Sequence, residues 1–280
     1  MTAPRVLRHP GPQAAIRHAA LPCHAHQVTL RLDPGLPFDQ AVTRAFAAAG
    51  YDAGYLRLCD LRFARLAWVM PAPAPGDGRA AWYSATEVFQ DAVLHQGGLH
   101  LGQRDGAPFM HCHGVWSGPE AVPRMGHLLN PESTLATAAE VTGWGLSGAR
   151  LEVTPDPETG FALFSPRAEG LADPGGAPAL LCTLRPNSDP HALLPQIAAQ
   201  HGVFAARIKG LGSLVGVSFT EGRIADYATE LLLTGGRLDQ GRATLEAVAT
   251  GFDGHPHAGG LAEGRNRICI TAELLILPQV

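Results

Sequence analysis

The sequence predicts an α+β fold made of two tandem domains, each a mostly antiparallel sheet with one principal flanking helix. Three observations predict it. The chain repeats part of itself at a constant offset of 152 residues. Each copy has one amphipathic helical segment followed by several short β-rich runs, which is typical of α+β proteins with antiparallel sheets. The 33 glycines and 23 prolines among 280 residues favour strands and turns over long helices.

The repeat begins where a strand-like segment runs through a proline turn into an apolar stretch. Leu32 aligns with Leu184 and Gly50 with Gly202, in both cases 152 residues apart. A constant offset over this length is poorly explained by chance similarity between apolar segments, so we interpret it as a tandem duplication.

The first copy is longer than the second. Glu140 aligns with Glu273 at an offset of 133, which is 19 residues less, and a Pro/Gly-rich insertion at 71–78 accounts for much of that difference. A second Pro/Gly-rich stretch at 169–178 separates the copies. We therefore expect an N-terminal arm over 1–26, a first domain over 27–167, a linker over 168–178 and a second domain over 179–280.

Each copy is expected to contain one helix. Apolar residues between Ala41 and Ala49 recur at helical spacing before Gly50, and the second helix is expected from Pro190 to about His201. Strands are expected at 28–32, 55–58, 66–69, 92–95 and 109–116 in the first copy, and at 180–184, 205–208, 215–219, 230–233, 244–249 and 267–277 in the second.

Composition narrows the class of protein. The net charge of −4 argues against nucleic-acid binding through a basic surface. The five cysteines are scattered without a CxxC pair, which indicates neither a disulfide framework nor a cysteine zinc site. The N-terminus lacks the apolar segment of a secretory signal, and no run approaches 18 apolar residues. We expect a cytoplasmic protein that does not span a membrane.

One group of histidines suggests chemistry. His111 and His113 stand at alternate positions of the predicted strand Phe109–Trp116, so their imidazoles should lie on one face. His127 follows just before the next strand-like run, and a hairpin would return it beside the pair. Three neutral imidazoles with open coordination positions suit a divalent transition metal such as zinc. The alternative is a set of three hydrogen-bonded polar residues near a cleft.

Two further histidine pairs suggest less. His24 and His26 lie in the proline-rich arm, and we expect a surface segment there. His255 and His257 flank a proline in a predicted turn, although His257 could reach toward a second site. The glycine-rich segment 209–213 is expected to be a turn, and its backbone could hold an anion.

Several of these segments, in order, resemble the PPC (plants-and-prokaryotes-conserved) domain. The motif of that family runs HxH, about a dozen residues, GGH, a strand and TAE. Here it is matched by His111-Cys-His113, Gly126-His127 and Thr137-Ala-Ala-Glu140. The second copy is similar in its other parts, including Glu230-Leu-Leu-Leu-Thr-Gly and Ile270-Thr-Ala-Glu273-Leu. The resemblance implies two tandem PPC-like domains.

The resemblance also implies assembly as homo-trimers and, for some prokaryotic members, a metal held by the three histidines. Plant members bind DNA through AT-hooks, which this sequence lacks, so a DNA-associated regulatory role transfers by family label alone.

The sequence departs from the family pattern in both copies. Met125 stands where the first glycine of GGH belongs. In the second copy Thr244 and Glu246 stand at the HxH positions, and Leu261 follows two glycines at the GGH position. We therefore expect one functional site in the first copy and a structural partner in the second.

Two functions remain open at this point. One is an oligomeric module that binds a metal or a small molecule. The other is a metal-dependent enzyme, since the PPC fold is similar to that of acetolactate decarboxylase, in which three histidines hold zinc. Arg104, Asp105 and Glu140 are candidate polar partners. Arg104 and Asp105 are also explained by a tight turn, and Glu140 by a strand-end carboxylate or an acceptor for a histidine N–H.

Overall fold

The computed structural model describes residues 5–170 and 175–279, and their fold is mostly sheet. Strands account for 57% of these residues and helices for 9%. In the part of the chain that the structure describes, fifteen strands form one large mixed sheet, in which one pairing, between β5 and β10, is parallel. The expected α+β class with one flanking helix in each domain is therefore wrong.

The elements follow one another in the same general order in both halves of the chain. In the first half they are β1 (His18–Leu32), α1 (Phe38–Ala48), β2 (Gly54–Val69), β3 (Pro71–Ala72), β4 (Trp82–Tyr83), β5 (Glu87–Arg104), β6 (Ala107–Ser117), β7 (Pro123–Leu128), η1 (Asn130–Glu132), β8 (Thr134–Leu135), β9 (Ala139–Ser147), β10 (Ala149–Pro155) and β11 (Ala162–Ala168). In the second half they are β12 (Ala177–Leu184), α2 (Pro190–Gln200), β13 (Ala205–Leu214), β14 (Val217–Ser218), β15 (Arg223–Ile224), β16 (Thr229–Asp239), β17 (Arg242–Thr250), β18 (His257–Gly260) and β19 (Ile268–Pro278).

The fold class differs from expectation because the strands are much longer than the apolar runs that predicted them. β2 has 16 residues and β5 has 18. Asp60 in β2 and Asp91 in β5 each have a φ of 54°, a left-handed conformation that aspartate tolerates better than most residues. β2 and β5 continue through these aspartates. In the sequence, the same polar residues interrupt the apolar pattern, so each long strand was predicted as shorter ones.

The second cause is that the two halves share one sheet. β1 begins at His18, inside the segment expected to be an arm, and pairs with β9 on one side and β12 on the other. The sheet therefore runs without interruption in the order β11-β10-β5-β6-β7-β2-β9-β1-β12-β19-β13-β16-β17-β18. The division into two domains, with part of its linker outside the described residues, stays a prediction.

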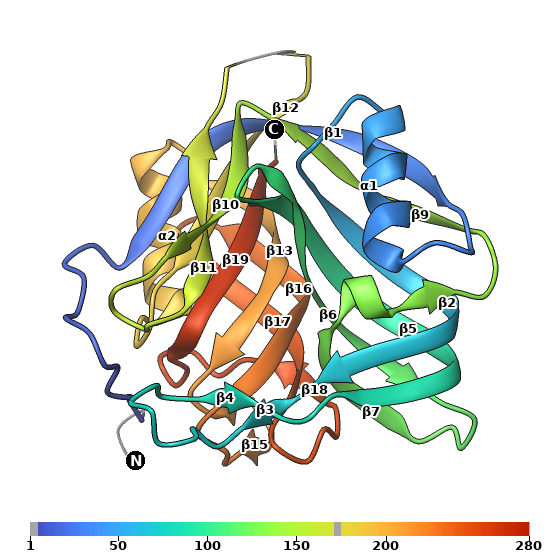
Figure 1. Ribbon diagram of the computed structural model, residues 1–280. Helices are drawn as coiled ribbons and strands as arrows, with labels where there is room; N and C mark the ends of the chain where they lie inside the picture. The colour runs from blue at the N-terminus through green and yellow to red at the C-terminus, as the bar shows by residue number, and fades with distance from the viewer. Residues whose placement is uncertain (1–4, 171–174, 280) are drawn as a thin grey trace.

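Each half nevertheless has its own hydrophobic cluster with its own helix, as expected for the two helical segments. Phe38, Val42 and Phe46 of α1 pack into a cluster drawn from residues 30–141. α2 packs into another from residues 180–276. Figure 1 shows α1 and α2 on opposite sides of the molecule. A smaller cluster joins the halves and contains Val115, Met125, Leu211, Leu232 and Val248.

The segment 209–213, expected to be a glycine turn, lies inside β13 instead. A Cβ atom at Gly210 would approach the backbone oxygen of Glu273 to 2.1 Å, so glycine allows β13 and β19 to come close together there. Within the described residues, neither α1 nor α2 has the length and hydropathy that a membrane-spanning helix requires.

Candidate metal centre

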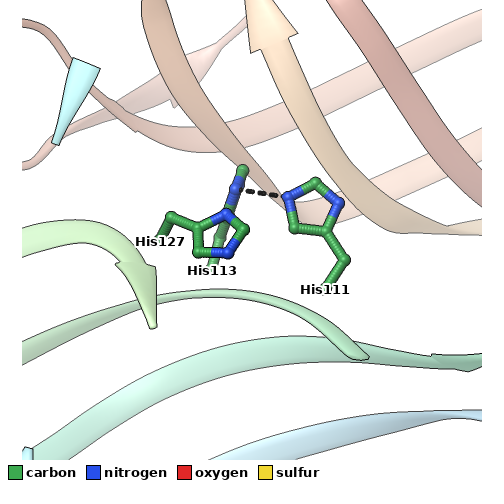
Figure 2. Close-up of side chains that lie close together, drawn as sticks. All are labelled: His111, His113 and His127. Carbon is green, nitrogen blue, oxygen red and sulfur yellow. Dashed lines mark hydrogen bonds between the residues drawn. The ribbon is translucent and has the colours of Figure 1, made fainter. Parts of the chain in front are cut away.

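Strand alternation and hairpin pairing bring the three predicted histidines together. His111 and His113 lie on the same face of β6, and Cys112 points to the opposite face, into the core of the first half. β7 pairs antiparallel with β6 and places His127 directly opposite His113. One ring nitrogen from each histidine lies within 4.8 Å of the others. Figure 2 shows the three side chains gathered at one place.

Residues of the second half fix the orientation of two of the imidazoles. The Nδ1 atom of His113 lies 2.9 Å from the backbone oxygen of Leu231 in β16. The Nδ1 atom of His111 lies 2.9 Å from Oε2 of Glu273 in β19. A carbonyl or carboxylate oxygen only accepts, so in both histidines Nδ1 carries a hydrogen, and Nε2 is the nitrogen that can hold a metal or, without one, a proton.

Three acceptor atoms consequently face one another at the centre of the site. The Nε2 atoms of His111 and His113 are 2.9 Å apart, and Oε2 of Glu230 lies 2.9 Å from Nε2 of His113. Among the described residues, Nδ1 of the third histidine, His127, is buried without a hydrogen-bond partner. Lone pairs at such distances require a shared proton or a cation between them. The donor set therefore fits a divalent transition metal.

Burial controls the charge of the histidines in the absence of a metal. Loss of solvation, together with the neighbouring His113, lowers the pKa of His111 to about 3. Burial, then His111 and His113, lowers the pKa of His127 well below its ordinary value. Burial also opposes charging of His113, but the carboxylate of Glu230, the backbone oxygen of Leu231 and the carboxylate of Glu273 together outweigh it and raise the pKa of His113. Two of the three imidazoles are thus neutral near pH 7, the form that binds metals.

Glu273 connects the site to both halves. Burial raises the pKa of its carboxyl to about 7, so above that pH it is a carboxylate and accepts the hydrogen of His111. Its backbone oxygen accepts a hydrogen bond of 3.1 Å from Nε2 of the buried His100 in β5. The first half thereby holds β19 at the position where Glu273 reaches the histidine.

A cavity of about 340 Å³ opens beside the histidines. His111 and His127 line it together with Glu230 and Glu273 of the second half. Aromatic residues form much of the remaining wall, namely Trp82, Tyr83, Phe109, Phe161 and Phe164. The rings of Tyr83 and His127 lie 5.5 Å apart.

Sequence reasoning missed Glu230, Glu273 and the tyrosine and tryptophan of β4. Glu230 and Glu273 stood in segments recognised as family-like, but no periodicity indicated that the second half reaches the histidines of the first. The second half is therefore more than a structural partner. Trp82 and Tyr83 follow the Pro/Gly-rich insertion, and the pairing of β4 with β3 brings them to the cavity.

The three polar residues proposed as partners fall in different places. Arg104 lines the cavity, whereas Asp105 lies in the β5–β6 turn with a φ of 52°. Glu140 is exposed on β9, opposite Arg31, so it is not the acceptor for a histidine; Glu273, the residue aligned with it, takes that role.

The other candidate positions do not form a comparable cluster within the described residues. Thr244 and Glu246 are exposed on β17, and Leu261 is buried. His24 and His26 lie on β1 rather than in an arm. His255 is exposed and contacts Arg124, and His257 begins β18.

Comparison with known proteins finds solved structures that resemble this chain with low TM-scores. No protein-family model matches the chain, and no curated protein matches it. A metal-containing protein from Archaeoglobus fulgidus is 22% identical, covering 51% of this chain and 94% of its own, with a TM-score of 0.39. A plant- and prokaryote-conserved (PPC) protein from Pyrococcus horikoshii is 16% identical over the same shares, with a TM-score of 0.39.

A third solved structure, named "Putative DNA-binding protein", comes from Ralstonia eutropha. It is 13% identical, covers 52% of this chain and 89% of its own, and has a TM-score of 0.36. Likenesses at this level establish neither the family nor the activity of this chain.

Proposed function

We propose that this protein is a tandem PPC-like protein that binds a divalent transition metal through His111, His113 and His127 and a small molecule in the adjoining cavity. The observation that carries the proposal is the arrangement of the imidazoles. His111 and His113 donate from Nδ1 to the second half and direct their Nε2 atoms at one point. A bound metal would supply a Lewis acid beside the cavity.

Elemental analysis of the purified protein tests this proposal. We expect about one zinc or similar ion per chain, since three imidazoles with one open side make one metal site. The variants His111→Ala and His113→Ala should lose the ion. His255→Ala removes an exposed histidine outside the cluster and should retain it. Equal metal content in all of these proteins would contradict the proposal.

A metal-dependent enzyme is the second candidate, favoured by the position of Glu230. Its carboxylate lines the cavity and lies 2.9 Å from Nε2 of His113, where it is placed to exchange a proton with a bound molecule. If the protein is an enzyme, Glu230→Gln should abolish turnover of a bound carbonyl compound and leave its binding in place. A direct DNA contact forms no part of the proposal, because the net charge of −4 gives it no support.

A further inference from the structure

The cavity has a second charged group besides those at the histidines. Arg104, the last residue of β5, lines the cavity and places its guanidinium carbon 3.9 Å from the centre of the Phe109 ring. Within the described residues it has no carboxylate partner, unlike Arg79, which pairs with Asp77 and lies over the ring of Trp82. An arginine stacked on a ring has a fixed orientation and keeps its donors available.

The spacing between this arginine and the histidines follows from the strands. Phe109 and His111 stand on the same face of β6, two residues apart, which is about 6.6 Å along a strand. The guanidinium of Arg104, which stacks on Phe109, is therefore separated from His111 by about the length of a small organic molecule. A ligand that reaches both groups needs a negative group at one end and an oxygen donor a few bonds away.

The aromatic side chains of the cavity indicate what the uncharged part of the ligand is. Two pairs of rings line the cavity: Trp82 and Phe161 stack 5.8 Å apart, and Phe109 and Phe164 meet edge to face at 5.6 Å. These surfaces favour a planar apolar group. The carboxylates of Glu230 and Glu273 repel an anion, and the charge of a bound divalent cation would offset that repulsion.

We propose that the cavity binds a small organic carboxylate with a planar apolar body, whose carboxylate pairs with Arg104 and whose second oxygen faces the three histidines. The proposal rests on the proposed function, since it assigns a ligand class to the same cavity. The bidentate geometry of an arginine–carboxylate pair makes Arg104 the residue that selects the acid.

Calorimetric titration with three compounds tests the assignment. Phenylpyruvate carries a carboxylate, a carbonyl and a ring; phenylacetone lacks the carboxylate, and pyruvate lacks the ring. The zinc-loaded protein should bind phenylpyruvate more tightly than either of the others. Arg104→Gln should weaken phenylpyruvate binding by about tenfold or more and leave phenylacetone unchanged.

Two further variants separate the contribution of the aromatic wall from that of the arginine charge. Trp82→Ala should weaken phenylpyruvate and phenylacetone together, because both carry the ring. Arg62→Gln removes the same charge from an exposed position of β2 outside the cavity and should behave as the parent protein. Arg104 is itself exposed, so its variant should fold, which a thermal melt checks.

Equal affinity of phenylpyruvate for Arg104→Gln and the parent protein, or no preference for phenylpyruvate over phenylacetone, would overturn the proposal. Zinc content is measured on the same samples, so that the two proposals fail separately. A protein that holds zinc without preferring the acid overturns the ligand class alone. If the protein takes up no zinc, the proposed metal site is wrong. The proposed ligand class then stands only if Arg104→Gln still weakens phenylpyruvate binding to the metal-free protein.

Discussion

Replacement of Glu273 by glutamine should weaken metal binding without disturbing the fold. Glutamine has nearly the same shape, and Glu273 is 1% exposed, so the packing around it is retained. The change removes the charge from the 2.9 Å bond that fixes the hydrogen on Nδ1 of His111. An amide is a weaker acceptor, and its NH₂ group can instead donate to Nδ1, which would move the lone pair away from the metal.

The expected magnitude follows from the role of such partners. Loss of a carboxylate that orients a metal-bound histidine typically costs 10–100-fold in metal affinity. One of the three imidazoles is affected here, so we expect a zinc dissociation constant higher by about tenfold to a hundredfold, or about 1.4–2.7 kcal/mol. Competition against a chromophoric chelator measures this shift directly.

Glu140→Gln is the matched control. Glu140 occupies the aligned position of the first half but is exposed on β9 opposite Arg31, so its replacement should leave the zinc affinity unchanged. If Glu273→Gln bound zinc as tightly as the parent protein, or if the two variants lost affinity equally, Glu273 would not orient a metal-bound histidine.

Three further predictions concern stability and assembly. Burial opposes ionisation of the carboxyl groups of Asp156 and Glu158. Hydrogen bonds from Thr159 and Arg185 to Asp156, and from Arg17 to Glu158, outweigh burial and hold both pKa values below normal. The two carboxylates should therefore stabilise the folded protein fully above about pH 5, and this stabilisation should be lost as the pH falls through their depressed pKa values. The loss should be smaller in Arg17→Met. Midpoints of urea unfolding between pH 7 and pH 2 measure it. Phe46→Ala should cost about 3–5 kcal/mol in the free energy of unfolding, because Phe46 is fully buried, whereas Phe204→Ala, at a side chain 75% exposed, should change it by less than about 0.5 kcal/mol in the same denaturation series. Light scattering should give a homo-trimer rather than the 29.4 kDa of one chain, and a monomer would contradict the family expectation.

The parts of the site that follow from local geometry were predictable from the sequence. The alternation of side chains along a strand placed His111 and His113 on one face, and the short connection to the next strand implied that His127 returns beside them. The first helix was located by the spacing of its apolar residues and by the glycine that follows it, and the second by its alignment with the first copy and by Gly202. These features depend on contacts within about 20 residues of chain.

The other parts of the site depend on how the two halves meet. Glu273 is 162 residues from His111, and Leu231 is 118 residues from His113. Glu140 and Glu273 occupy aligned positions, and nothing in the local pattern indicated that the second of them contacts the histidines. The same limit explains the fold class, because the joining of the halves through β1 and β12 is a pairing between distant segments.

The proposed metal centre consists of three imidazoles of the first half, oriented by the second half, around one metal ion. Anomalous scattering from crystals of the zinc-loaded protein tests it most directly. We expect one peak at about 2.0–2.1 Å from a ring nitrogen of each of His111, His113 and His127. The absence of a peak at these residues, or a fully occupied zinc elsewhere on the chain, would contradict it.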